Sequence, residues 1–513
     1  MSVQAKILSG VYSDSMTLMA LSTKVNKLPG VEKAMIGMGT AMNKAVISDV
    51  GLMLPEIEAA STGDMIYVVE CETEEMGAEI LAQIDKLRTA SVTEQNQETS
   101  YRSLDKAIED SDSSLVIISV PGEYAAAVAR KALDKDKNVM MFSDNVNVED
   151  ELALKQFAHE KGLLVMGPDC GTAIINNVGL CFANAVNEGS VGVVAASGTG
   201  AQELSVQVDA LGGGISQLIG VGGRDLSEDI GGIMMIDGLK MLAQDDQTKV
   251  IVLVSKPPAE AVADKVLEVA KGINKPIVAC FIGDTSTESD ATENSANLHF
   301  TNNTLEAAKK AVQASGISVD TDTKNYDFDY EKINASFTKT QKFIRGVFCG
   351  GTICDEVFYI LKHATDNVVS NVAKNAKDQL PVGAASHDNA LLDMGSDEFT
   401  SGRPHPMIDP TARNARLIKE AQDPETAVLL LDFVLGYGSN DDPVGVATDS
   451  IQQAFAVAKK DKRSLQIVAY VLGTDRDPQG KKSQISQLKE LGVHIVDSVV
   501  DMGNVALKII PQQ

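Results

Sequence analysis

The sequence predicts an α/β protein of three or four domains whose sheets are mainly parallel. Its 513 residues exceed what one hydrophobic core can organise. Over residues 104–318, and again from residue 341 to the end, apolar strand-like runs alternate with helical stretches, a pattern typical of parallel sheets. Two of these runs end in glycine-bearing turns that open amphipathic helices. Before residue 95 the pattern predicts a smaller α+β domain.

The small domain is predicted from three strand-like runs and three helical stretches that alternate along residues 1–95. In chain order these segments are 3–8, 15–27, 33–38, 41–51, 65–70 and 74–87. Residues 95–103 (QNQETSYRS) are polar and predict a linker.

Residues 104–188 predict a parallel α/β domain. Its strand-like runs are 115–120, 138–142 and 162–166, and its helices are 123–133 and 148–161. Ligands of such domains gather at the carboxyl ends of the strands. Asp169 and Cys170 follow the third run, so we count both as candidate substrate-binding residues. Cys170 fits a packed small residue better than a nucleophile.

Two further α/β domains are predicted at 189–318 and 341–513, joined by a polar linker. Each begins with a strand, a Gly-Thr turn and a helix, and each later contains Met-Ile-Asp, at 235–237 and 407–409. This order indicates that the two domains are distant copies of each other. The alternative is that they share only the general pattern of α/β proteins.

Composition excludes several classes of function. The net charge of −26 argues against nucleic-acid binding, since phosphate backbones need a basic surface. Residues 1–15 lack the apolar core of a signal peptide, and no run approaches the roughly 20 apolar residues of a membrane helix. The six cysteines are scattered, with neither a disulfide framework nor a zinc pattern. We therefore expect a reduced, cytoplasmic protein that binds no metal.

The two glycine-bearing turns are the first candidate site. They contain Ser197-Gly198-Thr199-Gly200 and Gly350-Gly351-Thr352. A helix start offers free N–H groups and the positive end of the helix dipole, which together hold phosphate or another oxyanion. Two such starts predict one anion held between two half-sites. The alternative is an ordinary helix cap. Neither turn fits the nucleotide-binding P-loop, because no lysine follows.

Three cationic or histidine-bearing runs could complete the site. Arg224 lies in a glycine-rich turn, where its guanidinium could hold a carboxylate or phosphate, unless it pairs with Asp225. His405 lies between prolines and could act as an acid or base, could hydrogen-bond a substrate carbonyl, or could be structural. Lys256 follows the apolar run 250–254, as a source of positive charge or as an exposed loop lysine. Arg403, Asp409 and Arg413 lie around His405 and complete the candidate set.

Together these motifs resemble the FdrA (AllF) family of the succinyl-CoA synthetase superfamily. The resemblance rests on residues 139–145 (VMMFSDN), 162–172 (GLLVMGPDCGT), 197–200 (SGTG), 222–225 (GGRD), 255–261 (SKPPAEA), 402–410 (GRPHPMIDP) and 431–438 (LDFVLGYG). It implies a Rossmann-like, CoA-binding-type domain at 104–188. It also implies two flavodoxin-like ligase domains, at 189–318 (α-subunit-like) and 341–513 (β-subunit-like). In that superfamily the helices after the two turns point at a shared phosphate.

The sequence departs from the ligases where they carry phosphate. The ligases have a phosphorylated histidine after the strand that matches 276–282, but residues 283–297 here contain no histidine. His299 falls in the next strand-like run, so we do not take it as the replacement. A glycine-rich CoA-binding turn is not evident in residues 96–122, and no ATP-grasp domain is present.

The resemblance implies a subunit of oxamate carbamoyltransferase, which interconverts oxalurate and phosphate with oxamate and carbamoyl phosphate in allantoin catabolism. Phosphate would then be a substrate held by Ser197–Gly200 and Gly350–Thr352, while Arg224, Arg403 and His405 orient the reacting groups. The implied partners are a small anionic substrate and other carbamoyltransferase subunits, and CoA is a possible cofactor. The alternatives are an acyl-CoA synthetase and a non-catalytic scaffold or anion-sensing subunit.

Overall fold

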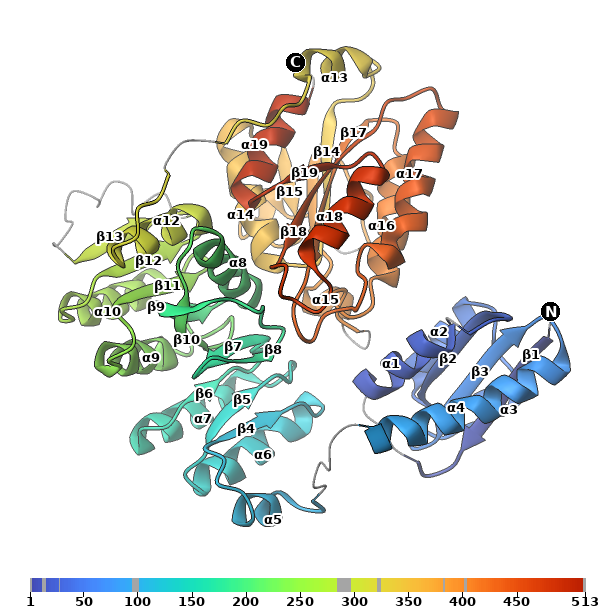
Figure 1. Ribbon diagram of the computed structural model, residues 1–513, viewed down its shortest axis with the longest axis horizontal. Coiled ribbons are helices and arrows are strands. Elements are labelled where there is room, and N and C mark those ends of the chain that lie inside the picture. The colour runs from blue at the N-terminus through green and yellow to red at the C-terminus, as the bar shows by residue number, and fades with distance from the viewer. Residues whose placement is uncertain are drawn as a thin grey trace. The chain divides into compact units, whose positions relative to one another are not determined.

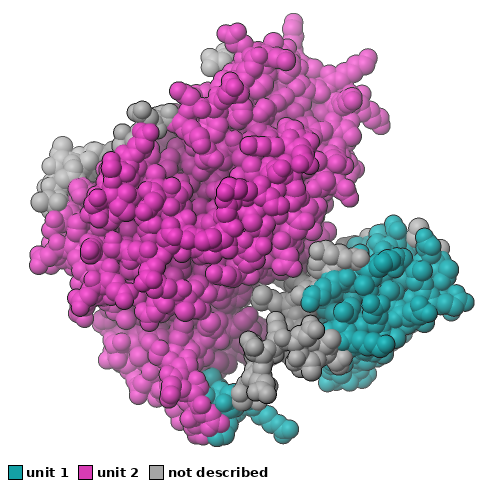
Figure 2. All heavy atoms as spheres, in the orientation of Figure 1, with its two compact units in different colours: residues 1–107 teal, residues 108–513 magenta. Residues whose placement is uncertain are grey.

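The computed structural model describes residues 2–11, 15–26, 28–94, 101–283, 297–320, 324–381, 383–400 and 404–510. The chain forms two compact units, Met1–Ala107 and Ile108–Gln513 (Figure 2). Arg403 lies outside the described residues. Among the residues that are described, no helix has both the length and the apolar composition that a bilayer span requires.

The first unit is built on a three-stranded antiparallel sheet in the order β1-β3-β2. The strands are β1 (Ser2–Leu8), β2 (Val31–Met38) and β3 (Met65–Cys71), and the helices are α1 (Ser15–Asn26), α2 (Ala41–Asp49), α3 (Pro55–Ala59) and α4 (Glu74–Glu94). The central strand is apolar throughout because both of its faces are covered: Tyr67 and Val69 pack in one core, and Ile66 and Val68 in the other. A short helix, α5 (Leu104–Glu109), follows the linker.

The second unit begins with a small parallel sheet of β4 (Leu115–Ile118), β5 (Asn138–Met141) and β6 (Val165–Met166). Its helices are α6 (Gly122–Asp134) and α7 (Val148–Lys161). Asn147 caps the start of α7, and Gly162 ends it in the left-handed conformation that favours glycine.

A seven-stranded sheet follows, in the order β13-β12-β11-β9-β10-β7-β8. Its strands are β7 (Thr172–Ile175), β8 (Val178–Cys181), β9 (Glu188–Ala196), β10 (Ile215–Gly220), β11 (Val250–Ser255), β12 (Ile277–Phe281) and β13 (Leu298–Thr301). The β7–β8 hairpin joins the edge antiparallel to β10, and the other five strands are parallel. Numbered along the chain, these five have the flavodoxin-like order 2-1-3-4-5. The helices are α8 (Gly198–Ala210), α9 (Ile233–Gln244), α10 (Glu260–Lys271) and α12 (Thr304–Ala314).

The last sheet is parallel and has six strands, in the order β15-β16-β14-β17-β18-β19. They are β14 (Phe343–Phe348), β15 (Val368–Ser370), β16 (Asn389–Asp393), β17 (Thr426–Val434), β18 (Gln466–Leu472) and β19 (His494–Val496). Without the edge strand β15, this sheet repeats the order 2-1-3-4-5. The helices are α13 (Tyr330–Ser336), α14 (Gly351–Ala364), α15 (Asp397–Thr400), α16 (Thr411–Gln422), α17 (Thr448–Lys460), α18 (Lys481–Glu490) and α19 (Val499–Ile509).

The repeated strand order supports the predicted duplication, but one of its motifs does not. Met235-Ile236-Asp237 lies inside α9, whereas Met407-Ile408-Asp409 lies in the turn before α16. The prediction that these motifs occupy equivalent positions was therefore wrong. The predicted fold class is confirmed: the chain is an α/β protein with a Rossmann-like domain, two flavodoxin-like domains and a small N-terminal domain.

The two large sheets meet through a layer of helices. Helices α8 and α12 pack on one face of the seven-stranded sheet, and α14 and α19 pack on one face of the six-stranded sheet. In Figure 1, α8 lies on the side of its sheet that faces the six-stranded sheet, where it contacts α14, and α12 contacts α19. The helices that open at the two predicted half-sites therefore belong to the same layer.

A buried ion cluster fixes the small parallel sheet to the seven-stranded sheet. Lys155 of α7 is fully buried and donates to Glu151 and to Asp225, both at 2.8 Å. It also donates to the carbonyl of Val221, just after β10, at 2.9 Å. Because Asp225 in turn accepts from the first amides of α9, this one ammonium group joins three segments of the chain.

We predict that K155M destabilises the protein by about 3–5 kcal/mol, because it leaves buried Asp225 without its cation and buried Glu151 with the part-exposed Arg224 alone. Urea unfolding followed by circular dichroism measures the change. K135M removes an exposed lysine at the end of α6 and should change stability by less than about 0.5 kcal/mol. A cost for K155M no larger than that of K135M would contradict the prediction.

Candidate functional site

The starts of α8 and α14 touch each other. The hydroxyl groups of Ser197 and Thr352 are hydrogen-bonded directly across the two helices. The amide of Thr352 also donates to the Thr199 hydroxyl at 3.2 Å. A Cβ atom on Gly200 would lie 3.0 Å from the Thr352 side chain, so glycine permits this close approach. The structure therefore brings the two predicted half-sites together; that they bind phosphate stays a prediction.

Some of the amides at these starts already have acceptors. Gly200 donates to the Ser197 hydroxyl, which caps α8, and Asp432 of β17 accepts from Cys349 and Gly350 at 2.7 and 2.8 Å. The N–H of Gly350 is therefore already hydrogen-bonded within the protein and is not available to a ligand. Among the described residues, the N–H groups of Gly198, Thr199 and Gly351 have no acceptor. These three are the donors left for an anion.

Both helix starts lie at the switch points of their sheets. Ser197 follows β9 and Lys256 follows the adjacent strand β11. Gly350 follows β14, and Asp432 belongs to the adjacent strand β17. Open α/β sheets bind their ligands at this place, just beyond the carboxyl ends of the strands where the order reverses. The arrangement thus joins two ordinary ligand-binding edges into one site.

Lys256 supplies a cation beside the two starts. Its ammonium group pairs with Asp355 of α14 at 2.6 Å, and its side chain remains 40% exposed. Burial lowers the pKa of Lys256, but the carboxylates of Asp355 and Asp393 outweigh that effect and raise it. Lys256 is therefore a permanent cation that a ligand can reach: a part-exposed loop lysine, as in the alternative interpretation, that is paired with Asp355.

Carboxyl groups gather at the same place. Burial raises the pKa of Asp393, at the end of β16, to about 7, although Lys256 opposes the shift. Burial also raises the pKa of Asp169 to about 7, with further contributions from Asp397, Asp144 and Asp393. Since Asp169 follows β6, the carboxyl edges of all three sheets in the second unit converge here.

His405 is held as a neutral hydrogen-bond donor. Its Nδ1 accepts from the amide of Met407 at 3.2 Å, and burial lowers its pKa to about 4. The ring is then neutral near pH 7, and we assign its proton to Nε2 from this hydrogen bond. A Cβ on Gly395 would lie 2.5 Å from Nε2, which places the ring beside the loop after Asp393. Of the predicted roles, this favours donation to a carbonyl over action as a base.

Four predicted residues have partners within the protein. Arg413 is buried and donates to the carbonyls of Val347 and Asp432, so it supports Asp432 and does not face a ligand. Asp409 accepts from Thr411 at the start of α16. For buried Arg413, the expectation of direct substrate contact is corrected, because its polar atoms serve the fold. Substrate contact by half-buried Asp409 stays a prediction.

Arg224 and Cys170 also have partners within the protein, and Cys170 is the packed small residue that the sequence favoured. Arg224 donates to Glu151 at 2.9 Å and to the Val146 carbonyl at 2.6 Å. The alternative in which it pairs with Asp225 was wrong, because Lys155 holds that carboxylate. Cys170 donates to the Gly220 carbonyl, and burial raises its pKa to about 12, so it stays a protonated, packed thiol.

The motifs did not predict two buried glutamates one turn or more inside the helices. Glu203 of α8 accepts from the Tyr470 hydroxyl and from Gln207. Glu356 of α14 accepts from the amide and hydroxyl of Thr304 at 2.9 Å. Both helices read Gly-Thr-x-x-x-Glu, at 198–203 and 351–356, a repeat that could have identified the pair. Burial raises the pKa of Glu203 to about 7; burial and the Glu203 charge raise that of Glu356 to about 8.

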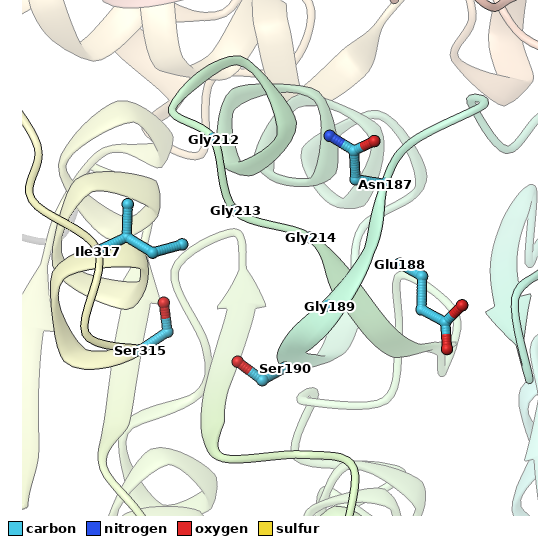
Figure 3. Close-up of a pocket in the computed structure, with 9 residues that line it drawn as sticks. All are labelled: Asn187, Glu188, Gly189, Ser190, Gly212, Gly213, Gly214, Ser315 and Ile317. Atoms are coloured by element: carbon cyan, nitrogen blue, oxygen red, sulfur yellow. The ribbon is translucent and has the colours of Figure 1, made fainter.

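A separate hollow of about 480 Å³ lies away from these residues (Figure 3). It is lined by Asn187, Glu188, Gly189, Ser190, Gly212, Gly213, Gly214, Ser315 and Ile317. These residues lie at the amino ends of β9 and β10 and after α12, at the edge opposite the helix starts. The hollow is therefore not part of the candidate site.

Comparison with known proteins relates all parts of the chain to described families. The model of the AllF heavy metal-associated domain matches residues 1–103, that of the CoA binding domain matches 186–283, and that of the CoA-ligase family matches 347–506. YahF of Escherichia coli K12 is 48% identical over 514 residues, which cover 99% of both chains.

Other relatives match only in part. The succinate–CoA ligase [ADP-forming] subunit alpha 1 of Archaeoglobus fulgidus is 28% identical over 190 residues, 36% of this chain and 64% of that protein. Among solved structures, the apo form of acetyl-coenzyme A synthetase 1 from Ca. Korarchaeum cryptofilum covers 81% of this chain and 86% of its own, with 16% identity and a TM-score of 0.32. No conclusion about function rests on that structural likeness.

The first unit does not fit a soft metal ion, in spite of the name of its family model. Residues 1–103 contain one cysteine, Cys71, and no histidine, and Cys71 is fully buried. Soft metals need several thiolate or imidazole ligands. In the part of the chain that the structure describes, no group of three or more histidine, cysteine or carboxylate side chains could hold a metal ion.

The candidate site also fits CoA poorly. CoA carries several phosphate charges, but the converging strand ends present Asp144, Asp169, Asp393 and Asp397 around the ammonium group of Lys256. At the start of α6, a Cβ on Gly122 would lie 2.3 Å from the carbonyl of Asp144, so the loop after β5 fills the place where a glycine-rich turn would admit a phosphate. We therefore derive no chemistry through CoA.

We predict that the protein loses stability as pH rises from about 5 to 8, and that E356Q reduces this loss. Because the folded state raises the pKa of Glu356 from 4.5 to about 8, it binds more protons than the unfolded chain in this window. Because its side-chain amide stays neutral, E356Q should have about the same free energy of unfolding as wild type near pH 5. At pH 8 its free energy of unfolding should be higher than that of wild type by about 1–3 kcal/mol.

Thermal unfolding at pH 5, 6.5 and 8 measures this difference. E260Q, at an exposed glutamate of α10, should retain the wild-type pH dependence. Equal pH dependence in wild type and E356Q would show that Glu356 is already ionised in the folded protein near pH 5, which contradicts the prediction.

Proposed function

We propose that this chain is a subunit of a phosphate-dependent oxamate carbamoyltransferase. It belongs to the FdrA (AllF) family and is similar to YahF over its whole length, and its domains resemble those of succinate–CoA ligases. The reaction converts oxalurate and phosphate into oxamate and carbamoyl phosphate. Other subunits of that enzyme are the proposed partners.

The observation that carries this proposal is the contact between the two helix starts. Ser197 and Thr352 present hydroxyl groups from opposite sheets, and the free amides of Gly198, Thr199 and Gly351 surround them. A phosphate held there is bound by dipoles and hydrogen bonds alone. Since residues 284–296 contain no histidine to carry a phosphoryl group, phosphate acts as a substrate.

The proposed step is an acyl transfer. A phosphate oxygen bonds to the carbamoyl carbon of oxalurate, and the bond from that carbon to the oxamate nitrogen then breaks. Negative charge develops on the carbamoyl oxygen between these events, and Lys256 and the Nε2–H of His405 are the groups proposed to stabilise it. Most of the rate enhancement then comes from positioning and electrostatics.

A second candidate is acid–thiol ligation, as in the succinate–CoA ligases. The matches to the CoA binding and CoA-ligase families favour it. CoA- and nucleotide-dependent formation of an acyl thioester by the purified chain would support this function over carbamoyl transfer. The acidic strand ends are the observation that speaks against it.

We predict that S197A and T352V each lower kcat/KM for oxalurate phosphorolysis by about 10–100-fold, because each breaks the Ser197–Thr352 hydroxyl pair, in which one hydroxyl donates to the other and the second can donate to phosphate. The assay measures carbamoyl phosphate, with and without candidate partner subunits. S205A is the matched control: it makes the same change on α8, where the Ser205 hydroxyl bonds only to the Gln202 carbonyl.

The control should retain wild-type activity. If S197A and T352V both kept the full activity of the assembled enzyme, the chain would be a scaffold or an anion sensor. If wild type with its partners released no carbamoyl phosphate, carbamoyl transfer itself would be wrong.

A further inference from the structure

Asp393 is held rigidly beside the helix starts. It ends β16 and is 5% exposed. The side-chain amide of Asn371 hydrogen-bonds the backbone of Asp393 twice: it accepts from the Asp393 N–H at 2.8 Å and donates to the Asp393 carbonyl at 3.0 Å. Its Oδ1 accepts from the amide of Gly395 at 2.8 Å. These three bonds leave the carboxyl group in one orientation.

The other carboxyl oxygen, Oδ2, lies against the first residue of α14. A Cβ on Gly351 would be 2.6 Å from this oxygen and 3.5 Å from the Lys256 ammonium. Gly351 also carries one of the amides that have no acceptor among the described residues. An oxyanion bound by that amide would therefore be a close neighbour of Asp393.

Charged and titratable groups from several segments surround Asp393. Lys256 follows β11 and is cationic, while Asp355 of α14, Asp432 of β17 and Asp169 after β6 are acidic. The protonated thiols of Cys349 and Cys354 and the neutral ring of His405 also lie nearby. Burial and the neighbouring carboxylates outweigh Lys256 and bring the pKa of Asp393 to about 7. Asp393 therefore exchanges its proton near neutral pH.

An anion and an ionised Asp393 exclude each other. Like charges a few ångströms apart in a partly buried site repel strongly. A proton on Asp393 removes this repulsion and converts the carboxylate into an O–H donor that faces the anion. Anion binding and proton uptake are then thermodynamically linked.

We propose that Asp393 takes up one proton when an oxyanion binds between the starts of α8 and α14, and that it gives this proton to the leaving nitrogen during transfer. The uptake needs only the oxyanion site, whereas the proton donation rests on the proposed carbamoyl transfer.

The proton balance of that step closes within the site. As a phosphate oxygen bonds to the carbamoyl carbon, the bond to the oxamate nitrogen breaks and its electron pair stays on nitrogen. Nitrogen takes the proton of Asp393, which becomes a carboxylate beside Lys256. The proton of the attacking hydrogen phosphate then passes to Asp393, so the acid is restored and carbamoyl phosphate leaves as the dianion.

Sulfate tests the uptake without catalysis, because it is a tetrahedral dianion with no proton to exchange near neutral pH. The full chain is titrated with sodium sulfate by calorimetry at pH 7.5, in two buffers of different ionisation enthalpy. We expect uptake of at least about half a proton per sulfate, and an affinity that falls up to about tenfold per pH unit above pH 7.

Three variants show which carboxyl group takes the proton. D393N should bind sulfate without proton uptake and with nearly the same affinity from pH 6.5 to 8.5. D169N should keep most of the uptake, and D397N, which neutralises an exposed carboxylate four residues along the chain, should keep all of it.

Each outcome decides the matter. Proton uptake that survives in D393N, or that is lost in D169N alone, would overturn the role of Asp393 and leave the oxyanion site intact. A flat pH profile of sulfate affinity in wild type would do the same without any variant. If wild type bound no sulfate, both this inference and the proposed phosphate site would be wrong.

Discussion

The direct contact between the start of α8 and the start of α14 is the constraint on which the arrangement of the second unit depends. For Ser197 to reach Thr352, two parallel sheets must stack through their helices, with the switch points of both at the same edge. Asp432 stabilises this contact. Its carboxylate accepts hydrogen bonds from the turn before α14, and Arg413 donates to its backbone carbonyl. The residues at these strand ends are thus explained first by the geometry of two meeting helices.

The same stacking buries acidic groups that an exposed helix would show to water. Glu203 and Glu356 occupy the same position in two related helices, and pairing those helices brings both carboxyls into one interior. Hydrogen bonds from Tyr470 and Thr304 satisfy their oxygens but do not neutralise two like charges. Protonation does so at little cost near neutral pH, because burial has already raised both pKa values. The stability of the helix layer between the sheets therefore depends on pH, because the layer buries these two glutamates.

The sequence predicted the elements and the two half-sites, because these depend on local patterns: apolar runs, Gly-Thr turns and helix periodicity. It did not predict Asp393 or Asp432, since an aspartate at a strand end has no signature of its own and acquires its role from the strand beside it. Arg413 was misjudged for the related reason that nearness to His405 in sequence does not place a side chain on the same side of the backbone. Strand order, which sets these neighbours, arises from long-range packing.

A site for an anion that is itself rich in carboxyl groups needs an explanation beyond the helix dipoles. The chain carries a net charge of −26, and Lys256 is opposed at close range by Asp355 and Asp393. Amides and dipoles hold a dianion more easily if some of that acidity is neutralised, and we propose that buried Asp393, with a pKa near 7, takes up the proton that does so. A ligase that stores phosphate covalently on histidine has no such need. Under the proposed function, phosphate enters as a free ion and leaves within carbamoyl phosphate, and coupling its charge to a proton would make its binding reversible.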